Sequence, residues 1–384
     1  MVEEANTLNK IPNLKLAQLK FLYIHQGHNP AIKEQIMTLV KDNFMAPYYS
    51  HICTELKWPV DAALLNQLSA KNETDLKNCE EKKIDAEKNL GDTEVLDAMI
   101  LKADYLCQIG DKDGAIAAYA AVAEKTGSLG TKLDVAFSQI RLGFLYSDAE
   151  LINKNIEKAK SLLESGGDWD RKNRLKVYEG LYAMSTRDFH TAADKFLDAL
   201  ATFTCTELLE YKEFIKYTII CALIAVDRIG IRKKLINAPE VLEVIHEISP
   251  LDSYMNSLYN CQYKEFFIAL AKLETLLKSD RYLYPHYKYI VKEMKIKAYS
   301  QLLESYKSLS LKSMADAFGV TLDFIDRELC RFIAAGRLNC VIDKVSLIVE
   351  TNRPDHKNAQ YQIMIKHGDV LLNRVQKLSR VTQL

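Results

Sequence analysis

The stretch Ala103–Val122, ADYLCQIGDKDGAIAAYAAV, decides the fold, because its pattern of small and large apolar residues returns further along the chain. Its pattern residues are Ala103, Ala115, Tyr119 and Val122, at offsets of 12, 16 and 19 from the first. The stretch Gly180–Ala199, GLYAMSTRDFHTAADKFLDA, has Gly180, Ala192, Phe196 and Ala199 at the same offsets. The pattern predicts two helices joined by a short turn, with a small residue on the first helix that lets the second pack closely.

A looser copy lies between these two stretches. Leu142-Gly143 and Tyr146 begin it, but Ala159 and Leu163 arrive four residues late, which predicts a longer turn inside this unit. The offsets resemble those of tetratricopeptide-type hairpins, although the period of 37 to 40 residues is longer than the usual one. Stacked hairpins bury a continuous core and form a right-handed superhelix, whose surface usually holds other proteins. An irregular helical bundle is the alternative.

The composition favours helices as well. The chain of 384 residues has only 14 Gly and 8 Pro, and the 179 residues between Pro59 and Pro239 contain no proline. Lys+Arg and Asp+Glu both number 51, so the net charge of +0 gives no overall attraction to nucleic acid or to membranes. The longest apolar run, Tyr217–Val226, is about half of the roughly 20 residues that span a bilayer. We therefore expect a globular helical protein with no membrane contact.

The cysteines indicate a reducing compartment. Eight are scattered through apolar stretches with no CxxC pair, as expected of reduced core residues. The acidic residues 1–6 lack the apolar segment of a signal peptide. We expect the protein in the cytoplasm and the nucleus.

A winged helix is predicted after a long helix that begins near Pro285. Ser310–Phe318 is a short helix, Gly319-Val320 a turn and Thr321–Ala335 a second helix, which Gly336 ends. Leu338–Ile342 and Val345–Val349 then alternate as a two-stranded hairpin joined at Asp343-Lys344. A two-stranded wing leaves a strand edge unpaired, and such edges serve for pairing with another chain. The expected partner-binding residues of this edge are Leu338, Cys340, Val345, Leu347 and Val349.

The second helix of the winged helix is a poor reader of DNA. Its acids Asp323, Asp326 and Glu328 outnumber Arg327 and Arg331, whereas a helix that enters a groove between phosphates is normally basic. The region from residue 286 to the end has 16 basic and 10 acidic residues, so weak contact with RNA stays an alternative. We do not expect nucleic acid as the main partner.

The tail from about residue 358 is predicted to be one final helix with a heptad seam. Met364, Leu371 and Leu378 are seven residues apart, and Val375 and Val381 lie beside them. These five residues are the second expected partner-binding set. The seam packs either on its own domain or against a helix of another chain.

No residue set predicts catalysis. The sequence contains no GxxxxGK[ST], GxGxxG, GxSxG or HExxH, so phosphate cradles, dinucleotide turns, serine elbows and zincin helices are missing. His25 and His28 are the only histidines within four residues of each other, and no Cys, Asp or Glu cluster joins them as metal ligands. The prediction is a protein that is not an enzyme, with no cofactor, no metal and no catalytic residue.

Helical hairpins, a winged helix and a terminal helix resemble the PCI family, which the proteasome lid, the COP9 signalosome and a translation initiation factor share. The resemblance is carried by blocks spread over nearly the whole chain. They are Asp42–Tyr49 (DNFMAPYY), Ala103–Asp111 (ADYLCQIGD), Gly166–Tyr178 (GGDWDRKNRLKVY), Ala298–Tyr306 (AYSQLLESY), Arg331–Leu338 (RFIAAGRL) and Asn373–Val381 (NRVQKLSRV). The expected segments are an N-terminal helical region 1–95, helical repeats 96–284, the winged-helix part of a PCI domain 285–352 and a C-terminal helix 353–384.

Within this family the blocks are most similar to a subunit of the proteasome lid. The resemblance implies a non-catalytic scaffold whose winged-helix edges pair with other PCI subunits and whose terminal helix joins the helical bundle of the lid. It also implies that the repeat arm contacts the ATPase ring or base, and that degradation of ubiquitinated proteins depends on the subunit indirectly. Subunit one of the COP9 signalosome, with the same architecture and longer ends, and a PCI protein that binds RNA are the alternatives. Trp169 is expected to pack into the groove between hairpins.

Overall fold

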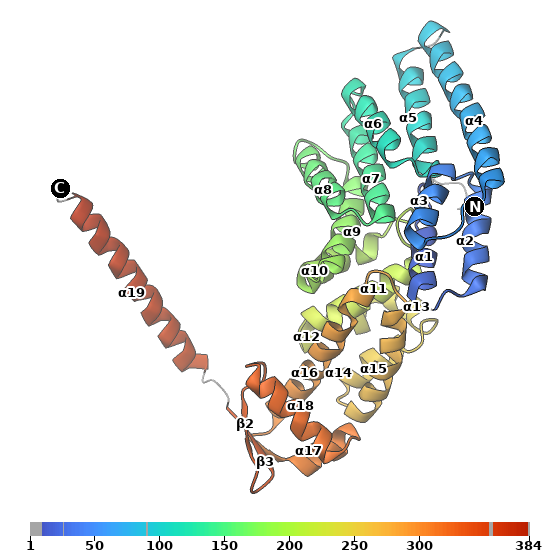
Figure 1. Cartoon of the computed structure of the whole chain (residues 1–384). Coiled ribbons are helices and arrows are strands. Elements are labelled where there is room, and N and C mark those ends of the chain that lie inside the picture. Colours follow the sequence, from blue (N-terminus) through green and yellow to red (C-terminus); the bar gives the residue numbers. More distant parts are fainter. Residues whose placement is uncertain (1–9, 26, 90, 353–355, 383–384) are drawn as a thin grey trace. The chain divides into compact units, whose positions relative to one another are not determined.

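The computed structural model describes residues 10–25, 27–89, 91–352 and 356–382, so the acidic residues 1–6 lie outside the described part. Helices form nearly all of it, with one small sheet (Figure 1), as predicted. The chain divides into two compact units. The first contains Met1–Tyr259 and Ile268–Val291, and the second contains Asn260–Phe267 and Lys292–Leu384.

The first unit begins with four helices, two of which have a proline in their first turn. They are α1 (Lys15–His25), α2 (Pro30–Asp42), α3 (Ala46–Leu56) and α4 (Ala62–Asn89). Leu16, Ile36 and Tyr48 lie in their common core and are almost fully buried. The charged helix α4 buries only Leu68, Asn72 and Ala86 over its 28 residues, which agrees with the mixed charges along it.

Three helical hairpins follow, formed by α5 (Asp92–Ile109) with α6 (Lys112–Lys125), α7 (Leu129–Tyr146) with α8 (Ala149–Glu164) and α9 (Trp169–Ser185) with α10 (Phe189–Ala199). Each pair packs together, and successive pairs are in contact (Figure 1). Gly180 is small for the reason that the sequence pattern implies. A Cβ at this position would lie 2.6 Å from Cε1 of Phe196, so no larger residue leaves room for α10.

The prediction of a longer turn in the middle hairpin is wrong. Two residues, Ser147-Asp148, separate α7 from α8, as Gly110-Asp111 separate α5 from α6. The true counterpart of Ala103 and Gly180 is Ile140, and the residues at offsets 12, 16 and 19 from it are Ile152, Ile156 and Ala159, all buried. This copy does not follow the sequence pattern, because its first helix has the large residue Ile140 where the other two hairpins have a small one.

An aspartate marks the start of the second helix in all three hairpins. Asp111, Asp148 and Asp188 are the N-caps of α6, α8 and α10, and each side chain accepts a hydrogen bond from the backbone N–H three residues later, at 3.1, 3.1 and 3.2 Å. This cap satisfies one of the N–H groups that a helix start leaves without a partner. The spacing of these three aspartates therefore marks the repeat independently of the apolar residues.

The first unit continues with further helices, three of which have 15 residues or more. These are η1 (Leu200–Thr202), α11 (Tyr211–Ala225), α12 (Arg228–Ile231), the π-helix η2 (Arg232–Ile236), α13 (Pro239–Ile245), α14 (Leu251–Tyr259), α15 (Tyr263–Lys278), η3 (Tyr284–His286) and α16 (Tyr287–Ser305), of which α15 and α16 contribute residues to both units. The apolar run at 217–226 is the buried centre of α11 and the residue after it. None of the described helices is long and apolar enough to cross a membrane.

The second unit contains the winged helix. Its elements are β1 (Ser308–Ser310), α17 (Leu311–Phe318), α18 (Leu322–Ala334), β2 (Cys340–Asp343) and β3 (Ile348–Thr351), followed by α19 (His356–Thr382). Ser310 caps α17 by accepting a hydrogen bond from the backbone N–H of Ser313 at 3.2 Å. The sheet is antiparallel with the order β1-β3-β2, and its register pairs Ser308 with Glu350 and Cys340 with Thr351. The wing therefore has three strands, not the two that the sequence predicted.

Candidate protein interaction surfaces

The third strand of the wing changes which backbone edge is open. Because β3 pairs with β1 on one side and β2 on the other, Val349 lies in the central strand and is fully buried, not on an edge. Leu338 and Cys340 are 6% and 4% exposed, so they belong to the core of the second unit. The sequence missed β1 because three residues, Ser308-Leu309-Ser310, are too short to show an alternating pattern.

The remaining two residues of the predicted edge lie in the hairpin turn, which is longer than expected. Residues 344–347 form it, and Asp343 accepts a hydrogen bond from the backbone N–H of Val345 at 2.9 Å and another from the Ser346 hydroxyl at 2.6 Å. These hydrogen bonds, that of Ser346 first, lower the pKa of the Asp343 carboxyl. Val345 is 96% exposed, and Leu347 has a φ of 55°. Neither is a strand residue.

The strand β2 is an outer strand of the sheet and presents Val341, which the sequence did not single out. Cys340 is buried, whereas Val341 is 55% exposed, so the side chains alternate between the core and the outside. The predicted edge set contains Leu338 and Cys340, which alternate with Val341 and lie on the opposite, buried side of the strand. The exposed apolar residues of β2 and the hairpin turn are Val341, Val345 and Leu347, the last with an exposed fraction of 43%.

Helix α19 is the second predicted surface, and its described side chains are all exposed. Met364, Leu371, Val375, Leu378 and Val381 have exposed fractions of 61 to 71%. The same helix exposes further large apolar residues that the heptad search left out, namely Tyr361, Ile363, Ile365, Val370 and Leu372. An exposed helix with this much apolar surface is expected to pack against other segments, and no described residue covers it.

These additional exposed apolar residues make the apolar stripe of α19 wider than the predicted heptad seam. At about 100° per residue, Met364, Leu371, Val375 and Leu378 share one stripe with Tyr361, Ile365 and Leu372, which spans more than a third of the helix circumference. A two-stranded coiled coil needs only a narrow stripe, so this width is typical of a helix that packs among several others. Val381 points to a different side of the helix, together with Ile363 and Val370, and is therefore not part of the stripe.

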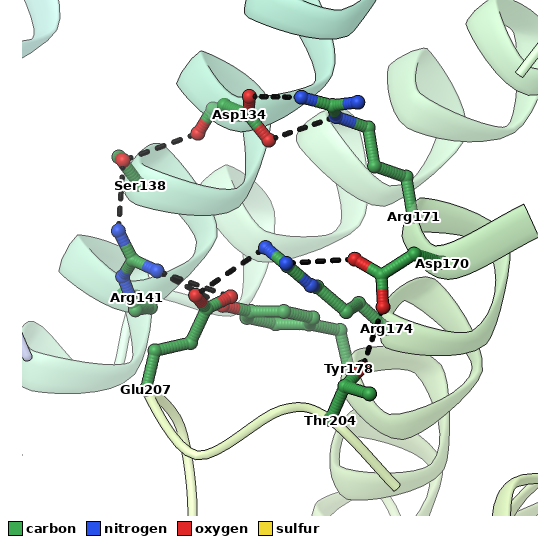
Figure 2. Close-up of polar contacts among 9 residues, drawn as sticks. All are labelled: Asp134, Ser138, Arg141, Asp170, Arg171, Arg174, Tyr178, Thr204 and Glu207. Carbon is green, nitrogen blue, oxygen red and sulfur yellow. Dashed lines mark hydrogen bonds and ion pairs between the residues drawn. The ribbon is translucent and has the colours of Figure 1, made fainter. Parts of the chain in front are cut away.

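The first unit contains a buried cluster of charged groups, which Figure 2 shows. Arg141 of α7 lies 3.2 Å from Glu207 and donates to the hydroxyl oxygens of Tyr178 and Ser138. Tyr178 of α9 in turn donates to Glu207 at 2.7 Å, and its ring stacks on Phe137 at a centroid distance of 4.9 Å. The cluster ties two neighbouring hairpins to the segment that follows α10.

A second layer of ion pairs surrounds this cluster. Arg174 pairs with Asp170 at 2.7 Å, and Asp170 also accepts from the Thr204 hydroxyl at 2.8 Å (Figure 2). Burial raises the pKa of the Tyr178 phenol well above its ordinary value. Burial opposes the charge of Arg141, but Tyr178 and Glu207 outweigh it and raise the pKa of its guanidinium. Tyr178 and Arg141 therefore keep their protons, and the side chains of the cluster are engaged with one another, as in a structural tie.

A cavity of about 300 Å³ borders the cluster. Its polar lining includes Asp104, Asp134, Arg141, Arg174 and Glu207. Asp104 accepts from the Tyr119 hydroxyl at 2.7 Å, and burial raises the pKa of its carboxyl. Since acids and guanidinium groups line the cavity together, its charge selects neither an anion nor a cation.

The histidine pair does not form a ligand set. The ring of His25 lies 4.4 Å from that of Phe21 and 4.2 Å from that of Tyr284, while the ring of His28 lies 4.9 Å from that of Tyr23. Within the described ranges, no three His, Cys, Asp or Glu side chains gather in a way that could hold a metal ion.

Comparisons with known proteins agree with this arrangement. A family model described as 26S proteasome subunit RPN7 matches residues 61–234, a PCI domain model matches 270–353, and a model of the 26S proteasome regulatory subunit RPN7/PSMD6 C-terminal helix matches 360–381. The last match falls within α19, the helix with the exposed apolar stripe.

Several relatives match nearly the whole chain, among them those of Arabidopsis thaliana and Dictyostelium discoideum. The 26S proteasome non-ATPase regulatory subunit 6 homolog of Arabidopsis thaliana is 48% identical over 377 residues, 97% of either chain. The 26S proteasome non-ATPase regulatory subunit 6 of Dictyostelium discoideum is 46% identical over 381 residues, 98% of either chain. The COP9 signalosome complex subunit 1 of Arabidopsis thaliana is 26% identical over 201 residues, 51% of this chain and 45% of that protein.

Proposed function

The chain belongs to the family of 26S proteasome non-ATPase regulatory subunit 6, and on this basis we propose that it is a non-catalytic scaffold subunit of the proteasome regulatory particle lid. It supports lid assembly and, through the assembled particle, the ATP-dependent degradation of ubiquitinated proteins. In this proposal residues 96–284 form the repeat arm, 285–352 the winged-helix part of the PCI domain and 353–384 the helix that enters the shared bundle, with 1–95 as an N-terminal helical region.

The apolar stripe of α19 is the observation that carries the proposal. Leu371, Val375 and Leu378 are each more than 60% exposed in the chain alone, although Leu and Val side chains gain roughly 1.5–3 kcal/mol each from full burial. A stripe of this width favours several neighbouring helices over one. Helices of other lid subunits supply such a cover.

The winged helix offers a second contact to other PCI subunits, at the outer edge of β2. The strand pairs with β3 along residues 340–343, and Val341 and Val345 provide apolar surface near its outer side. Addition of a strand from a neighbouring PCI subunit would satisfy the outer backbone groups of β2. Leu338, Cys340 and Val349 support this edge from the core without touching the neighbour, and Leu347 shapes the turn.

We propose contact with the ATPase ring or base for the repeat arm, and a location in both cytoplasm and nucleus. The arm suits such contact because stacked hairpins form an extended surface. The pairing of Arg141, Tyr178 and Glu207 favours a structural role for its buried charges and supports a subunit without catalysis of its own.

The test is isolation of the tagged chain from cells under native conditions, followed by mass spectrometry and a fluorogenic peptide-hydrolysis assay of the eluate. Recovery of lid and ATPase subunits together with ATP-stimulated peptidase activity is the expected result. Recovery of COP9 signalosome subunits without peptidase activity would instead support the scaffold of that complex, which the partial match to its subunit 1 keeps as the second candidate. Recovery of RNA alone would overturn both.

The variant Leu371→Glu tests the carrying observation. A carboxylate in the centre of the stripe would remain charged inside a helical bundle, at a cost of several kcal/mol. We expect loss of incorporation into the lid while the circular dichroism and melting temperature of the isolated chain stay unchanged. The matched control is Lys366→Glu, because Lys366 is an exposed polar residue of the same helix, outside the stripe. Normal incorporation of Leu371→Glu would remove α19 as the interface.

A further inference from the structure

The helical segment that follows α11 concentrates positive charge on its surface. Elements α12 and η2 run without a break over residues 228–236. The cations of this segment are Arg228, Arg232, Lys233 and Lys234, and all four are exposed. Asp227 is the one acid beside them in the sequence. The segment is therefore strongly basic in a chain whose net charge is +0.

Contacts on the inner side hold this segment in place. Ile231 and Leu235 are buried and face the core of the first unit. Arg228 donates from Nη2 to the backbone oxygen of Tyr259 at 2.8 Å, and its guanidinium lies 5.1 Å from the centroid of the Tyr259 ring. Arg228 thus ties the segment to the end of α14, and the cations of η2 remain on the outer side.

Ile229 is the apolar centre of this outer side. Its exposed fraction is 75%, the highest among the large apolar side chains described in the first unit. Residues three and four apart are neighbours on a helix, so Ile229 lies beside Arg232 and Lys233. The segment ends as a π-helix, in which the backbone N–H of Asn237 donates to the oxygen of Arg232 at 3.1 Å. Such π-helical turns are rare and occur frequently at functional sites.

The three cations of η2 form no ion pair with any residue that the structure describes. Elements α13 and α14 pack against η2, but acids in and beside them have other partners. Glu247 forms an ion pair with Lys212, and Asp252 accepts a hydrogen bond from the side chain of Asn256 at 2.6 Å. These acids therefore leave the charge of η2 available to a partner.

The two acids of α13, Glu240 and Glu243, act on the start of α11. The hydroxyl of Tyr211 donates to the backbone oxygen of Glu240 at 3.4 Å. Burial raises the pKa of the Tyr211 phenol, and the carboxylates of Glu243 and Glu240 raise it further. Neither carboxylate pairs with a cation of η2 among the described residues.

The combination of charge and apolar surface favours an acidic protein segment over nucleic acid. A phosphate backbone would use the cations and leave Ile229 in water. A peptide in which carboxylates flank an apolar side chain would contact the cations and Ile229 together. Both features of the outer side are then used.

The exposed Trp169 does not select a partner in this way. The expectation that it packs into the groove between hairpins is wrong, because it is the first residue of α9 and is 64% exposed. Its neighbour Asp168 lies 3.6 Å from Arg171, and Arg171 also donates to both carboxylate oxygens of Asp134. The charges beside the indole are therefore paired within the chain.

We propose that the outer face of α12 and η2 is a docking surface for an acidic segment of a partner protein, in which carboxylates flank an apolar side chain. The surface consists of Ile229, Arg232, Lys233 and Lys234. It is distinct from the stripe of α19 and from the edge of β2. The inference goes beyond the scaffold role, since it depends on the charge of this segment and not on entry into the lid.

The first experiment measures the binding of defined ligands to the full chain by fluorescence anisotropy. The probe is a short labelled peptide in which aspartates and glutamates flank a central leucine. The comparison ligands are the same peptide with serine for leucine, the same peptide with amides for acids, and oligouridine RNA of equal charge. We expect the acidic leucine peptide to bind most tightly and to weaken as salt screens the charges. Equally tight binding of the serine peptide or of the RNA would overturn the proposal.

Variants of the full chain test the named residues. Arg232→Glu with Lys233→Glu should weaken binding of the probe about tenfold or more, because two attractive charges become repulsive. Ile229→Ser should weaken it about fivefold and leave the salt dependence unchanged, since only apolar contact is lost. The matched control, Lys154→Glu with Lys158→Glu, reverses two exposed lysines one turn apart on α8 and should bind normally.

Folding is checked by the circular dichroism and melting temperature of each variant. The substituted side chains are exposed, so both should match the parent chain. If the charge-reversed variant unfolds, the neutral variant Arg232→Gln with Lys233→Gln replaces it and should weaken the probe less, but measurably. Unchanged affinity in a folded variant of either kind would overturn the docking surface.

The last experiment identifies the partner in cells. The photo-crosslinking residue p-benzoylphenylalanine replaces Ile229 in the full chain, and the cross-linked peptides are sequenced after irradiation. A dominant link to a segment rich in Asp and Glu is the expected result, and the same residue at Lys154 should not yield that peptide. No link, a link to RNA or a link to a segment without acids would overturn the proposal. Failure of the chain to enter a lid would instead overturn the proposed function alone, because the purified chain would still bind the probe.

Discussion

The hairpin of α9 and α10 and the terminal helix α19 have similar apolar periodicity and opposite fates. Phe189 and Phe196 on α10 are buried almost completely, whereas Leu371 and Leu378 on α19 are 61% and 64% exposed. A three-residue turn places α10 against α9, but no described helix covers α19. This difference shows that apolar periodicity predicts a helix and its apolar face. Whether another segment of the same chain covers that face depends on how the chain connects the two segments.

The largest effect that would sharpen this comparison is expected from Phe196→Ala. The ring is fully buried against Gly180 and lies 5.6 Å from that of Phe214, so its removal leaves a cavity and should lower the free energy of unfolding by about 3–5 kcal/mol. Urea denaturation followed by circular dichroism measures this. A loss below about 1 kcal/mol would mean that the hairpin interface is far looser than the geometry indicates.

The buried charges of the repeats give the next largest effect. Glu207→Gln removes the charge that faces Arg141 at 3.2 Å and should destabilise the first unit by about 2–3 kcal/mol, because the guanidinium stays buried with weaker partners. The double variant Arg141→Met with Glu207→Gln should recover part of the loss, and a double-mutant cycle in denaturant measures the coupling. Strict additivity of the two changes would contradict a direct pair.

A smaller effect comes from the caps that define each hairpin. Asp148→Ala removes the N-cap of α8 and should cost about 1 kcal/mol, whereas Asp148→Asn keeps an acceptor oxygen and should cost less. The hydrogen bond from Lys112, with that from Leu151, lowers the pKa of Asp148 below its ordinary 3.8. Its stabilisation is therefore present above pH 3.8 and is lost as the pH falls through the lowered pKa.

The pH dependence offers a control for this cap. The free energy of unfolding of the parent chain should lose this contribution as the pH falls below about 4. The free energy of unfolding of Asp148→Asn should depend less on pH over that range. Urea titrations of both proteins at several pH values compare the slopes. Parallel profiles would show that the charge of Asp148 is not what the cap uses.

The smallest effect on stability is expected from a substitution on the exposed stripe of α19. Leu371→Ala removes as much apolar surface as a core substitution, yet it should change the stability of the isolated chain by less than about 0.5 kcal/mol because Leu371 is 61% exposed. Thermal unfolding of the isolated chain is the measurement. A loss of unfolding free energy comparable to that of Phe196→Ala would show that α19 packs on its own chain, and would contradict the difference between the two regions.

Features that depend on residues close together in the sequence were predicted correctly more often than features that depend on residues far apart. The hairpins, the helices of the winged helix and α19 were predicted because each follows from spacing within about 20 residues. The middle hairpin was misread because Ile140 replaced the small residue on which the search relied. The edge was misread because β1 and β3, 38 residues apart at their nearest ends, pair to bury Val349.

The sequence alone established that the chain is helical, where its first and third hairpins turn, that a winged helix follows them, and which residues give α19 an apolar seam. The tertiary structure was needed to show that Val349 is internal, that Val341 lies on an outer strand, and that Trp169 is 64% exposed at the start of α9. The physical reason is that local periodicity fixes the face of an element, whereas exposure depends on the distant segment that covers it or leaves it open.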